Sequence, residues 1–194
     1  MRRKLFLTGA SGCGKSTLIR CRLGGALSLA GGFVTERALS NDGSTAGYDL
    51  YPAAHAAGVA GFEGARFLDY TVTPPTHDNE VFRREGVQLL EEAAYYPFAL
   101  IDEFGGYEIL VPQFCAALVG LIRSDVPCIG VLKGFENAQE LKQRFGLGDR
   151  YTQKLRALYD MLRADPDVLI VEMSGSGDEN AAEKVQSWAA EYAR

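Results

Sequence analysis

The feature that most constrains the fold is a glycine-rich run at residues 9–16, Gly-Ala-Ser-Gly-Cys-Gly-Lys-Ser, followed by Thr17. It satisfies the pattern G-x-x-x-x-G-K-[ST], in which glycines let successive backbone N–H groups turn toward a chain of phosphates. Lys15 then reaches the β- and γ-phosphates, and the Ser16 hydroxyl is a ligand for Mg²⁺. Such a loop works between a strand and a helix, because the helix N-terminus adds positive potential to the same site. The run therefore predicts an α/β fold with a phosphate site.

The segments on either side of this loop have the required character. Lys4 to Thr8 has the apolar pattern of a strand, and residues 16–29 have the composition of a helix. Further along, short apolar segments alternate with helical stretches, which is typical of a layered α/β domain. Strands are predicted at residues 33–37, 46–52, 67–72, 98–101, 128–132 and 168–173, and helices at residues 78–96, 107–124, 136–164 and 178–192.

Local turn signals refine this arrangement. Asn41-Asp42-Gly43 predicts a hairpin, and Gly31-Gly32 is interpreted as the end of the first helix. The predicted fold class is α/β, a P-loop NTPase with a mainly parallel sheet flanked by helices and a small β-hairpin excursion. We expect one domain over residues 1–194, with a helical, lid-like insertion at residues 133–165 that is broken near residues 146–148. Residues 53–65 are rich in alanine and glycine, and no element is assigned to them from the sequence.

A second motif lies at the end of the apolar strand predicted at residues 98–101, which runs directly into Asp102 and Glu103. In open α/β sheets ligands bind at the carboxyl ends of the strands, so both carboxylates should face the glycine-rich loop. Asp102 is expected to hold Mg²⁺ through water, as in other P-loop sites. Glu103 is placed to accept a proton from an attacking water molecule, which makes it the candidate general base.

The composition limits the partners of the chain. Lysine and arginine total 20 against 25 acidic residues, which gives a net charge of −5. This balance provides no broad attraction to nucleic acid or to an anionic membrane, and no apolar run is long enough to cross a bilayer. The four cysteines form no CxxC pair, so neither a zinc site nor a disulfide framework is expected. We expect a cytoplasmic protein without nucleic-acid or membrane partners.

Several motifs together resemble the thermophilic and cancer-related nucleoside-triphosphatase family. They occur in one order: residues 9–17, Gly32-Phe33-Val34-Thr35, Asp69-Tyr70-Thr71-Val72 and Ile101-Asp102-Glu103-Phe104-Gly105-Gly106-Tyr107-Glu108, with Phe114 matching a downstream aromatic. The likeness implies a RecA-like fold, hydrolysis of a broad range of nucleoside triphosphates, dependence on Mg²⁺ and nucleotide contacts at both motifs. By the same likeness Glu103 is the expected base, and Glu108 is a motif glutamate. The chain departs from the family at Glu36, which follows Thr35 directly instead of lying two residues beyond it.

These observations predict a set of site residues. The expected catalytic residues are Lys15 and Glu103, and the expected Mg²⁺ ligands are Ser16 and Asp102. An arginine often completes such a site by offsetting transition-state charge, and Arg144 or Arg150 is the candidate. The nucleotide-binding residues are predicted to be Gly9, Ala10, Ser11, Gly12, Cys13, Gly14, Lys15, Ser16, Thr17, Asp102, Glu103, Phe104, Gly105, Gly106, Tyr107 and Glu108.

Three functions are compatible with these residues. The favoured one is hydrolysis of ATP, GTP and other nucleoside triphosphates to the diphosphate and phosphate, with Mg²⁺ as cofactor. The second is a small-molecule kinase that acts on a nucleoside- or nucleotide-like acceptor, in which residues 133–165 form the lid and residues 46–80 the acceptor pocket. The third is a nucleotide-dependent switch or assembly factor that acts on a protein partner. The absence of the guanine-reading motif N-K-x-D argues against a GTPase switch.

Overall fold

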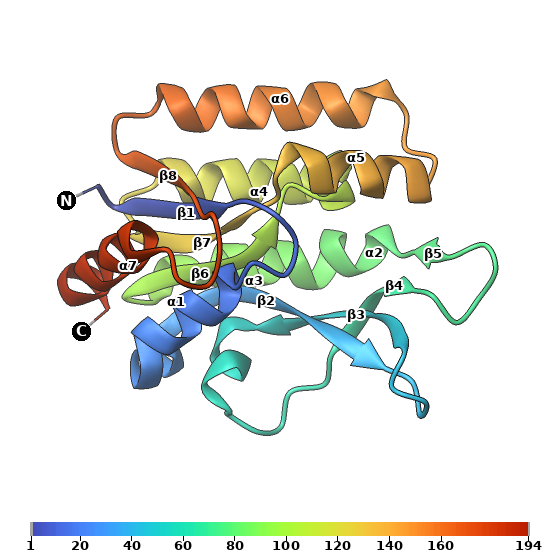
Figure 1. Cartoon of the computed structure of the whole chain (residues 1–194), viewed down its shortest axis with the longest axis horizontal. Coiled ribbons are helices and arrows are strands. Elements are labelled where there is room, and N and C mark those ends of the chain that lie inside the picture. The colour runs from blue at the N-terminus through green and yellow to red at the C-terminus, as the bar shows by residue number, and fades with distance from the viewer. Residues whose placement is uncertain (1, 194) are drawn as a thin grey trace.

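The computed structural model describes residues 2–193 and contains a mixed β-sheet covered by helices on both faces (Figure 1). Its strands run in the spatial order β5-β4-β3-β2-β6-β7-β1-β8. Their bounds are β1 (Lys4–Thr8), β2 (Ala30–Leu39), β3 (Thr45–Pro52), β4 (Ala65–Asp69), β5 (Thr76–His77), β6 (Phe98–Phe104), β7 (Cys128–Leu132) and β8 (Val168–Glu172).

The sheet has a parallel and an antiparallel part. Strands β2, β6, β7, β1 and β8 pair in parallel, whereas β3, β4 and β5 form an antiparallel extension that begins with the β2–β3 hairpin. In β1, Leu5, Phe6 and Leu7 are fully buried, because helices cover both faces of the parallel strands. This confirms the predicted mainly parallel sheet with a hairpin excursion.

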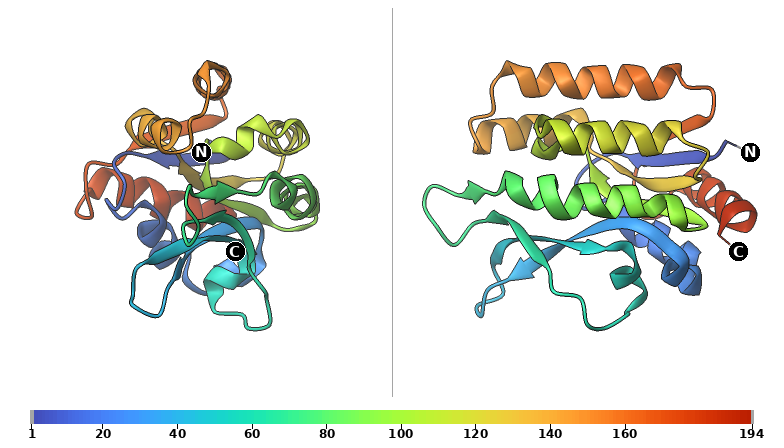
Figure 2. Two further views of the ribbon diagram at one scale, coloured as in Figure 1. Left: turned by 90° about the vertical axis from the view of Figure 1, so that its right-hand side faces the viewer. Right: turned by 180° about the vertical axis from the view of Figure 1, so that it is seen from behind.

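The helices lie in two groups on opposite faces of the sheet. In the left panel of Figure 2, α7 and α4 lie on opposite sides of the strands. One apolar cluster joins α1 and α7 to the sheet around Trp188, and another joins α3, α4 and α6 to the other face. The helices are α1 (Lys15–Leu23), α2 (Asn79–Val81), α3 (Val87–Glu92), α4 (Pro112–Arg123), α5 (Phe135–Arg144), α6 (Asp149–Ala164) and α7 (Glu179–Tyr192). None of these described helices has the length and apolar character needed to cross a membrane.

The first predicted helix is shorter than expected. It ends at Leu23, and residues 24–29 form a 3-10 helix. The prediction that Gly31-Gly32 ends this helix was wrong, because both glycines lie in β2. Gly32 has a positive φ of 88°, and a Cβ there would lie 2.3 Å from the carbonyl oxygen of Leu100. The glycine is needed for the close approach of β2 to β6, which local sequence does not reveal.

Three other predicted elements change in detail. The helix predicted at 78–96 contains a π-helical turn at Phe82–Gly86 between α2 and α3. The helix predicted at 107–124 starts as a 3-10 turn, Tyr107–Leu110, before Pro112 opens α4. The strand predicted at 67–72 runs instead from Ala65 to Asp69. The predicted break in the stretch 136–164 is confirmed, and it separates α5 from α6 at Gly146, whose φ is 60°.

Candidate functional site

The glycine-rich loop, residues 9–14, leads from β1 into α1 at the carboxyl edge of the sheet. Gly9, Gly12 and Gly14 all have positive φ angles, of 133°, 74° and 98°. At Gly9 a Cβ would lie only 2.4 Å from the carbonyl oxygen of Met173, so this position accepts no side chain. The local sequence therefore produces the backbone turn that a phosphate-binding loop requires.

Lys15 opens α1 and turns its side chain over the loop. Its ammonium donates hydrogen bonds to the carbonyl oxygens of Gly9, at 3.0 Å, and Ala10, at 2.6 Å. The residue is only 7% exposed, which is unusual for lysine. A cation held in this way over the glycine-rich loop, at the N-terminus of α1, is placed to meet an anionic ligand.

The two predicted Mg²⁺ ligands, 86 positions apart, are in direct contact. The Ser16 hydroxyl donates a hydrogen bond of 2.7 Å to Asp102 Oδ1. Asp102 is 3% exposed, and its burial raises the pKa of the carboxyl group to about 6, although the bond from Ser16 and the nearby Arg20 act in the opposite direction. A hydroxyl and a carboxylate are hard oxygen donors, the kind that Mg²⁺ prefers, and a P-loop site completes its coordination with phosphate oxygens and water. The donor set therefore fits Mg²⁺.

A charged network behind Asp102 was missed by sequence reasoning. Arg20 Nη2 lies 3.5 Å from Asp102 Oδ2, and Arg20 Nη1 donates to Glu36 Oε1 at 2.9 Å. The other oxygen of Glu36 lies 3.3 Å from His55 Nε2. The available signal was that Arg20 follows Ser16 by four residues, which places both on one face of a helix. The network gives a role to Glu36, the residue at which the chain departs from the family pattern.

The Glu103 side chain lies beside the glycine-rich loop and pairs with another residue that sequence reasoning missed. Its carboxylate lies 3.2 Å from the ammonium of Lys133, and its side chain is 29% exposed. Lys133 is the first polar residue after the apolar strand β7, so the rule that located Asp102 and Glu103 would also have located it. The structure thus brings an acidic and a basic side chain together beside the loop.

The side chains of the residues after Glu103 point mostly into the protein interior. Phe104 is fully buried, and its ring packs against Phe6 with the centroids 4.9 Å apart. Glu108 Oε1 accepts hydrogen bonds from the backbone N–H groups of Gly105 and Gly106, each at 2.7 Å. Burial raises the pKa of Glu108 to about 7. The geometry therefore gives Glu108 the task of holding the turn that follows Glu103, and a nucleotide contact for residues 104–108 stays a prediction.

Two cavities meet at this site. The first, of about 220 Å³, is here called the phosphate cavity, and its P-loop lining consists of Ser11, Gly12, Gly14, Lys15, Ser16 and Thr17. The second, of about 200 Å³, is here called the aromatic cavity, and its rings are Tyr48, Phe67, Tyr70, Phe82 and Tyr107. The residues that line both are Ser11, Glu103, Lys133 and Asn137.

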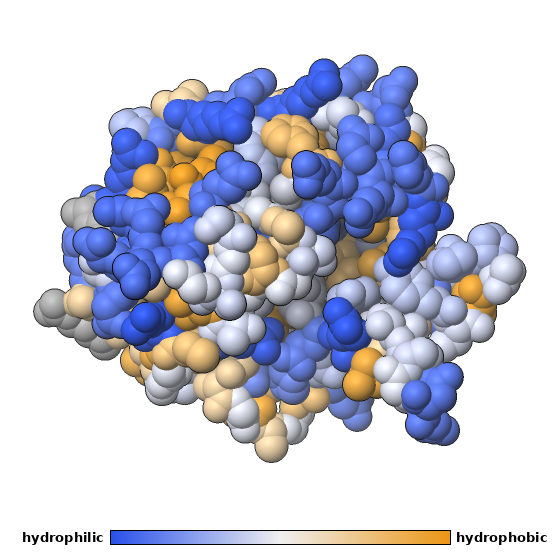
Figure 3. Space-filling model, in the orientation of Figure 1, coloured by the Kyte–Doolittle hydropathy of each residue, from blue (hydrophilic) through white to orange (hydrophobic). Residues whose placement is uncertain are grey.

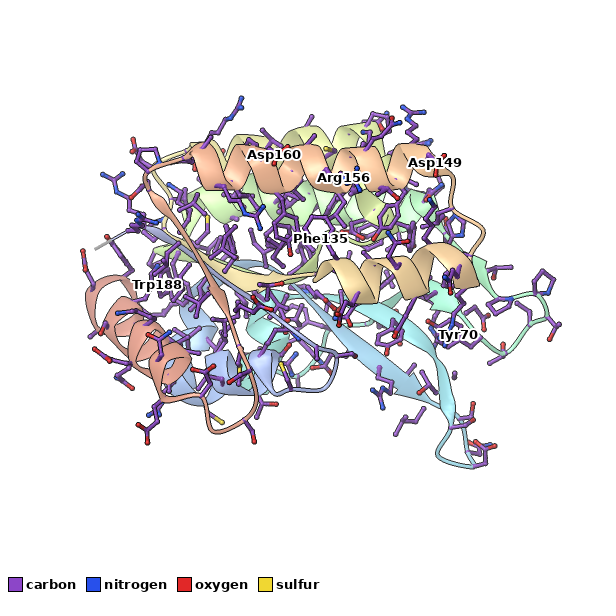
Figure 4. The ribbon with its side chains drawn as sticks, turned by 45° about the horizontal axis from the view of Figure 1, so that its top comes forward. Tyr70, Phe135, Asp149, Arg156, Asp160 and Trp188 are labelled. Carbon is purple, nitrogen blue, oxygen red and sulfur yellow. The ribbon has the colours of Figure 1, made fainter. Side chains whose placement is uncertain are left out.

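The two candidate arginines occupy different places. Arg144 lines the aromatic cavity, and its guanidinium lies 5.5 Å from the centre of the Tyr70 ring. Figure 4 shows Tyr70 below the end of α5 that leads into the loop before α6. Arg150 is exposed on α6, and neither of the two cavities includes it. Lys133, rather than either arginine, is therefore the cation beside Glu103.

Comparisons with known proteins agree with this geometry. A model of the family described as NTPase matches residues 4–152. No curated protein matches the chain. Among solved structures, the crystal structure of THEP1 from the hyperthermophile Aquifex aeolicus is similar, with a TM-score of 0.60 and 17% sequence identity. The match covers 95% of this chain and 97% of that chain, so the two share a fold over nearly their whole lengths.

Proposed function

The chain belongs to the NTPase family, and we propose that it hydrolyses nucleoside triphosphates to the diphosphate and phosphate with Mg²⁺ as cofactor and Glu103 as general base. One observation carries the proposal. The bond of 2.7 Å between Ser16 and Asp102 lies beside a cavity that contains both Lys15 and Glu103. Phosphate-binding, metal-binding and proton-accepting groups therefore surround one space.

Binding of the triphosphate rests on the loop and on Lys15. The Lys15 ammonium is satisfied by two backbone carbonyl oxygens, which are weaker partners than charged phosphate oxygens. A triphosphate in the phosphate cavity replaces these partners, while the backbone N–H groups of the loop surround its β-phosphate. Lys15 is then next to the γ-phosphate, where negative charge redistributes during transfer.

Ser16 and Asp102 are the residues that would hold Mg²⁺. When bound, the ion neutralises charge on the phosphate oxygens during transfer. Asp102 is kept in place from behind by Arg20, which Glu36 holds in turn. This support fixes the direction of the carboxylate toward Ser16.

Glu103 is the group that takes the proton. It is partly exposed and lines the phosphate cavity together with Lys15, so a water molecule beside it can face the γ-phosphate. As the oxygen of this water forms a bond to the γ-phosphorus, the proton of the water passes to the Glu103 carboxylate. The bond from that phosphorus to the oxygen bridging to the β-phosphate breaks, and the nucleoside diphosphate leaves. Lys133 acts as a positioning residue, because its ammonium, 3.2 Å away, directs the Glu103 carboxylate toward the cavity.

The test of this function is steady-state phosphate release from ATP, GTP, CTP and UTP, each with Mg²⁺ and with excess chelator. We expect turnover of all four with kcat/KM values within about tenfold, a range of about 1.4 kcal/mol, because the proposed contacts are with phosphates. We expect no turnover with chelator. A hundredfold preference for one base would contradict phosphate-based recognition, and full activity in chelator would contradict the role of Mg²⁺.

A further inference from the structure

The aromatic cavity joins the phosphate cavity at the end where chemistry takes place. The two share Glu103 and Lys133, whereas Gly14, Ser16 and Thr17, farther along the loop, line the phosphate cavity and not the aromatic one. A molecule in the aromatic cavity would therefore meet the γ-phosphate beside Glu103. Hydrolysis needs no second cavity at this point, because one water molecule is enough.

The lining of the aromatic cavity changes from one end to the other. The end shared with the phosphate cavity carries the charged pair Glu103–Lys133 and the polar side chains of Ser11 and Asn137. Five aromatic rings, among them Tyr48, line the rest, together with the charged side chains of Glu108, Glu140 and Arg144. In Figure 3 apolar atoms show in the hollow between α5 and the segment from β4 to β5, and hydrophilic residues surround it. The cavity therefore suits a molecule with a flat ring for the aromatic side chains and polar substituents for the charged ones.

The volume limits the size of that molecule. At about 200 Å³ the cavity is smaller than the range of about 300–1,000 Å³ typical of sites for drug-sized ligands. A single ring with small substituents suits this space, because aromatic side chains stack well on flat rings.

We propose that the aromatic cavity is a phosphoryl-acceptor site, which binds a single-ring alcohol and directs its hydroxyl group to the γ-phosphate beside Glu103. The alcohol oxygen forms a bond to the γ-phosphorus, and the bond from that phosphorus to the oxygen bridging to the β-phosphate breaks. Glu103 accepts the hydroxyl proton, and the products are a phosphate monoester and the nucleoside diphosphate. The proposal rests on the triphosphate site proposed above, and it adds an alternative to water as the acceptor.

Helix α5 connects the two cavities and covers the acceptor site. Near its start the Asn137 side chain donates to the carbonyl oxygen of Gly9 in the P-loop, at 3.2 Å. Just beyond its end, the Phe145 ring packs on Tyr70, with centroids 6.2 Å apart, and on His77, at 5.9 Å. The helix thus contacts both the nucleotide loop and the wall of the acceptor site. A ring held beneath it displaces water from Glu103, so an acceptor suppresses hydrolysis while it is itself phosphorylated.

The experiment incubates the full chain with MgATP and each of three ring alcohols: benzyl alcohol, 4-hydroxybenzyl alcohol and pyridoxine. Glycerol serves as the acyclic control. ³¹P NMR measures the phosphate ester and inorganic phosphate in the same sample. We expect at least one ring alcohol to form an ester at least about tenfold faster than glycerol and to lower the rate of phosphate release.

The outcomes separate the two proposals. Phosphate release with no ester from any of the three ring alcohols overturns the acceptor site and leaves the hydrolase in place. Ester formation without phosphate release in the absence of acceptor supports the acceptor site and overturns the hydrolase. If neither phosphate nor ester is formed, both proposals are overturned.

A matched pair of variants on α5 locates the acceptor. Leu141 lines the aromatic cavity, whereas Gln143, two residues further along, is exposed. Leu141→Trp should lower the ratio of ester to phosphate at least tenfold, because the indole occupies the cavity, and Gln143→Trp should leave the ratio unchanged. Tyr48→Leu, which removes a ring but keeps apolar bulk, should also lower the ratio and serves if Leu141→Trp does not fold. An unchanged ratio in the folded cavity variants overturns the proposal.

Discussion

The phosphate cavity and the aromatic cavity share four residues and have similar volumes, yet they are built in opposite ways. The first consists largely of one short run, residues 11–17, and the groups that we propose to bind the phosphates are mainly backbone N–H groups and Lys15. The second draws its lining from β2, β3, β4, the π-helical turn, β6 and α5, and its working groups are side chains. A site made of consecutive residues is visible in a sequence, whereas a site made by topology emerges only in the folded chain.

The same difference predicts how the cavities respond to mutation, and Lys15→Ala should have the largest effect. The variant removes the one loop side chain that we place beside the γ-phosphate. We therefore expect kcat/KM to fall by about 10³- to 10⁵-fold, the range for loss of an arginine that stabilises phosphoryl transfer, and triphosphate affinity to weaken. Calorimetry with MgATP and a phosphate-release assay measure the two effects. Lys184→Ala on α7 is the control, and circular dichroism should show both variants folded. Wild-type affinity in Lys15→Ala would remove the phosphate site as assigned.

Glu103→Gln tests the point at which the cavities meet. The amide keeps the size of the carboxylate but cannot accept a proton, so kcat should fall by about 10²- to 10⁴-fold. Triphosphate affinity should stay within a few-fold. Because Glu103 lines both cavities, ester formation and phosphate release should fall together. Turnover at the wild-type rate would show that Glu103 is not the base, and failure to fold or to bind nucleotide would make it a structural residue.

Asp102→Asn should affect the phosphate cavity through its cation. The loss of one negative charge near the metal should raise the Mg²⁺ concentration for half-maximal activity by about 10- to 100-fold. A Mg²⁺ titration at saturating ATP measures this shift. Saturating Mg²⁺ should restore part of the rate, because Ser16 and the phosphates remain as ligands. An unchanged Mg²⁺ requirement would contradict the assignment of Asp102.

Lys133→Met removes the cation that pairs with Glu103. We expect kcat to fall about tenfold, equivalent to about 1.4 kcal/mol of activation free energy, with little change in triphosphate affinity. Lys133→Arg should restore most of the loss, since it keeps a cation within reach of Glu103. If Arg and Met at this position behave alike, the charge of Lys133 has no part in orienting the base.

Glu108→Gln should have the smallest effect on turnover of these variants, and its main effect should be on stability. The folded protein raises the pKa of Glu108 from 4.5 to about 7, so this group favours the folded state below pH 4.5 and the contribution is lost as the pH rises through 7. Glutamine keeps the acceptor for the N–H groups of Gly105 and Gly106 but does not titrate. Urea unfolding at pH 5, 6 and 8 should therefore show that the unfolding free energy falls less with rising pH in the variant than in the wild type. Equal declines in both proteins would contradict the assigned pKa.

Much of the fold could be predicted from the sequence, because its signals are local. The P-loop glycines, the Asn41-Asp42-Gly43 turn and the apolar run of β6 each specify a backbone conformation from a few neighbouring residues. The prediction at Gly31-Gly32 was wrong because both glycines serve contacts with residues far along the chain: Gly31 lies against Ala93 and Tyr96, and Gly32 approaches Leu100 of β6. Sequence patterns report local geometry well and report contacts between distant strands poorly.

In the candidate site, too, some contacts could be predicted from the sequence and others depend on the fold. The meeting of Ser16 with Asp102 could be predicted, since both motifs end strands or begin helices at one edge of the sheet. The ion pair of Glu103 with Lys133 and the contact of Arg20 with Asp102 depend on which strands and helices are neighbours. Glu108 turns inward because its carboxylate accepts hydrogen bonds from the backbone N–H groups of residues 105 and 106. The presence of a glutamate in the motif does not predict this orientation.

The position of β1 between β7 and β8 also affects when, during folding, the P-loop becomes fixed in place. The P-loop follows β1 near the start of the chain, but the partners of β1 are residues 128–132 and 168–172. Trp188 on the last helix also donates a hydrogen bond of 2.9 Å to the carbonyl oxygen of Arg3. Contacts of such high sequence separation slow the search for the native state. Because β1 is held between β7 and β8, the glycine-rich loop that follows β1 is fixed in place only once those two strands have been synthesised and paired.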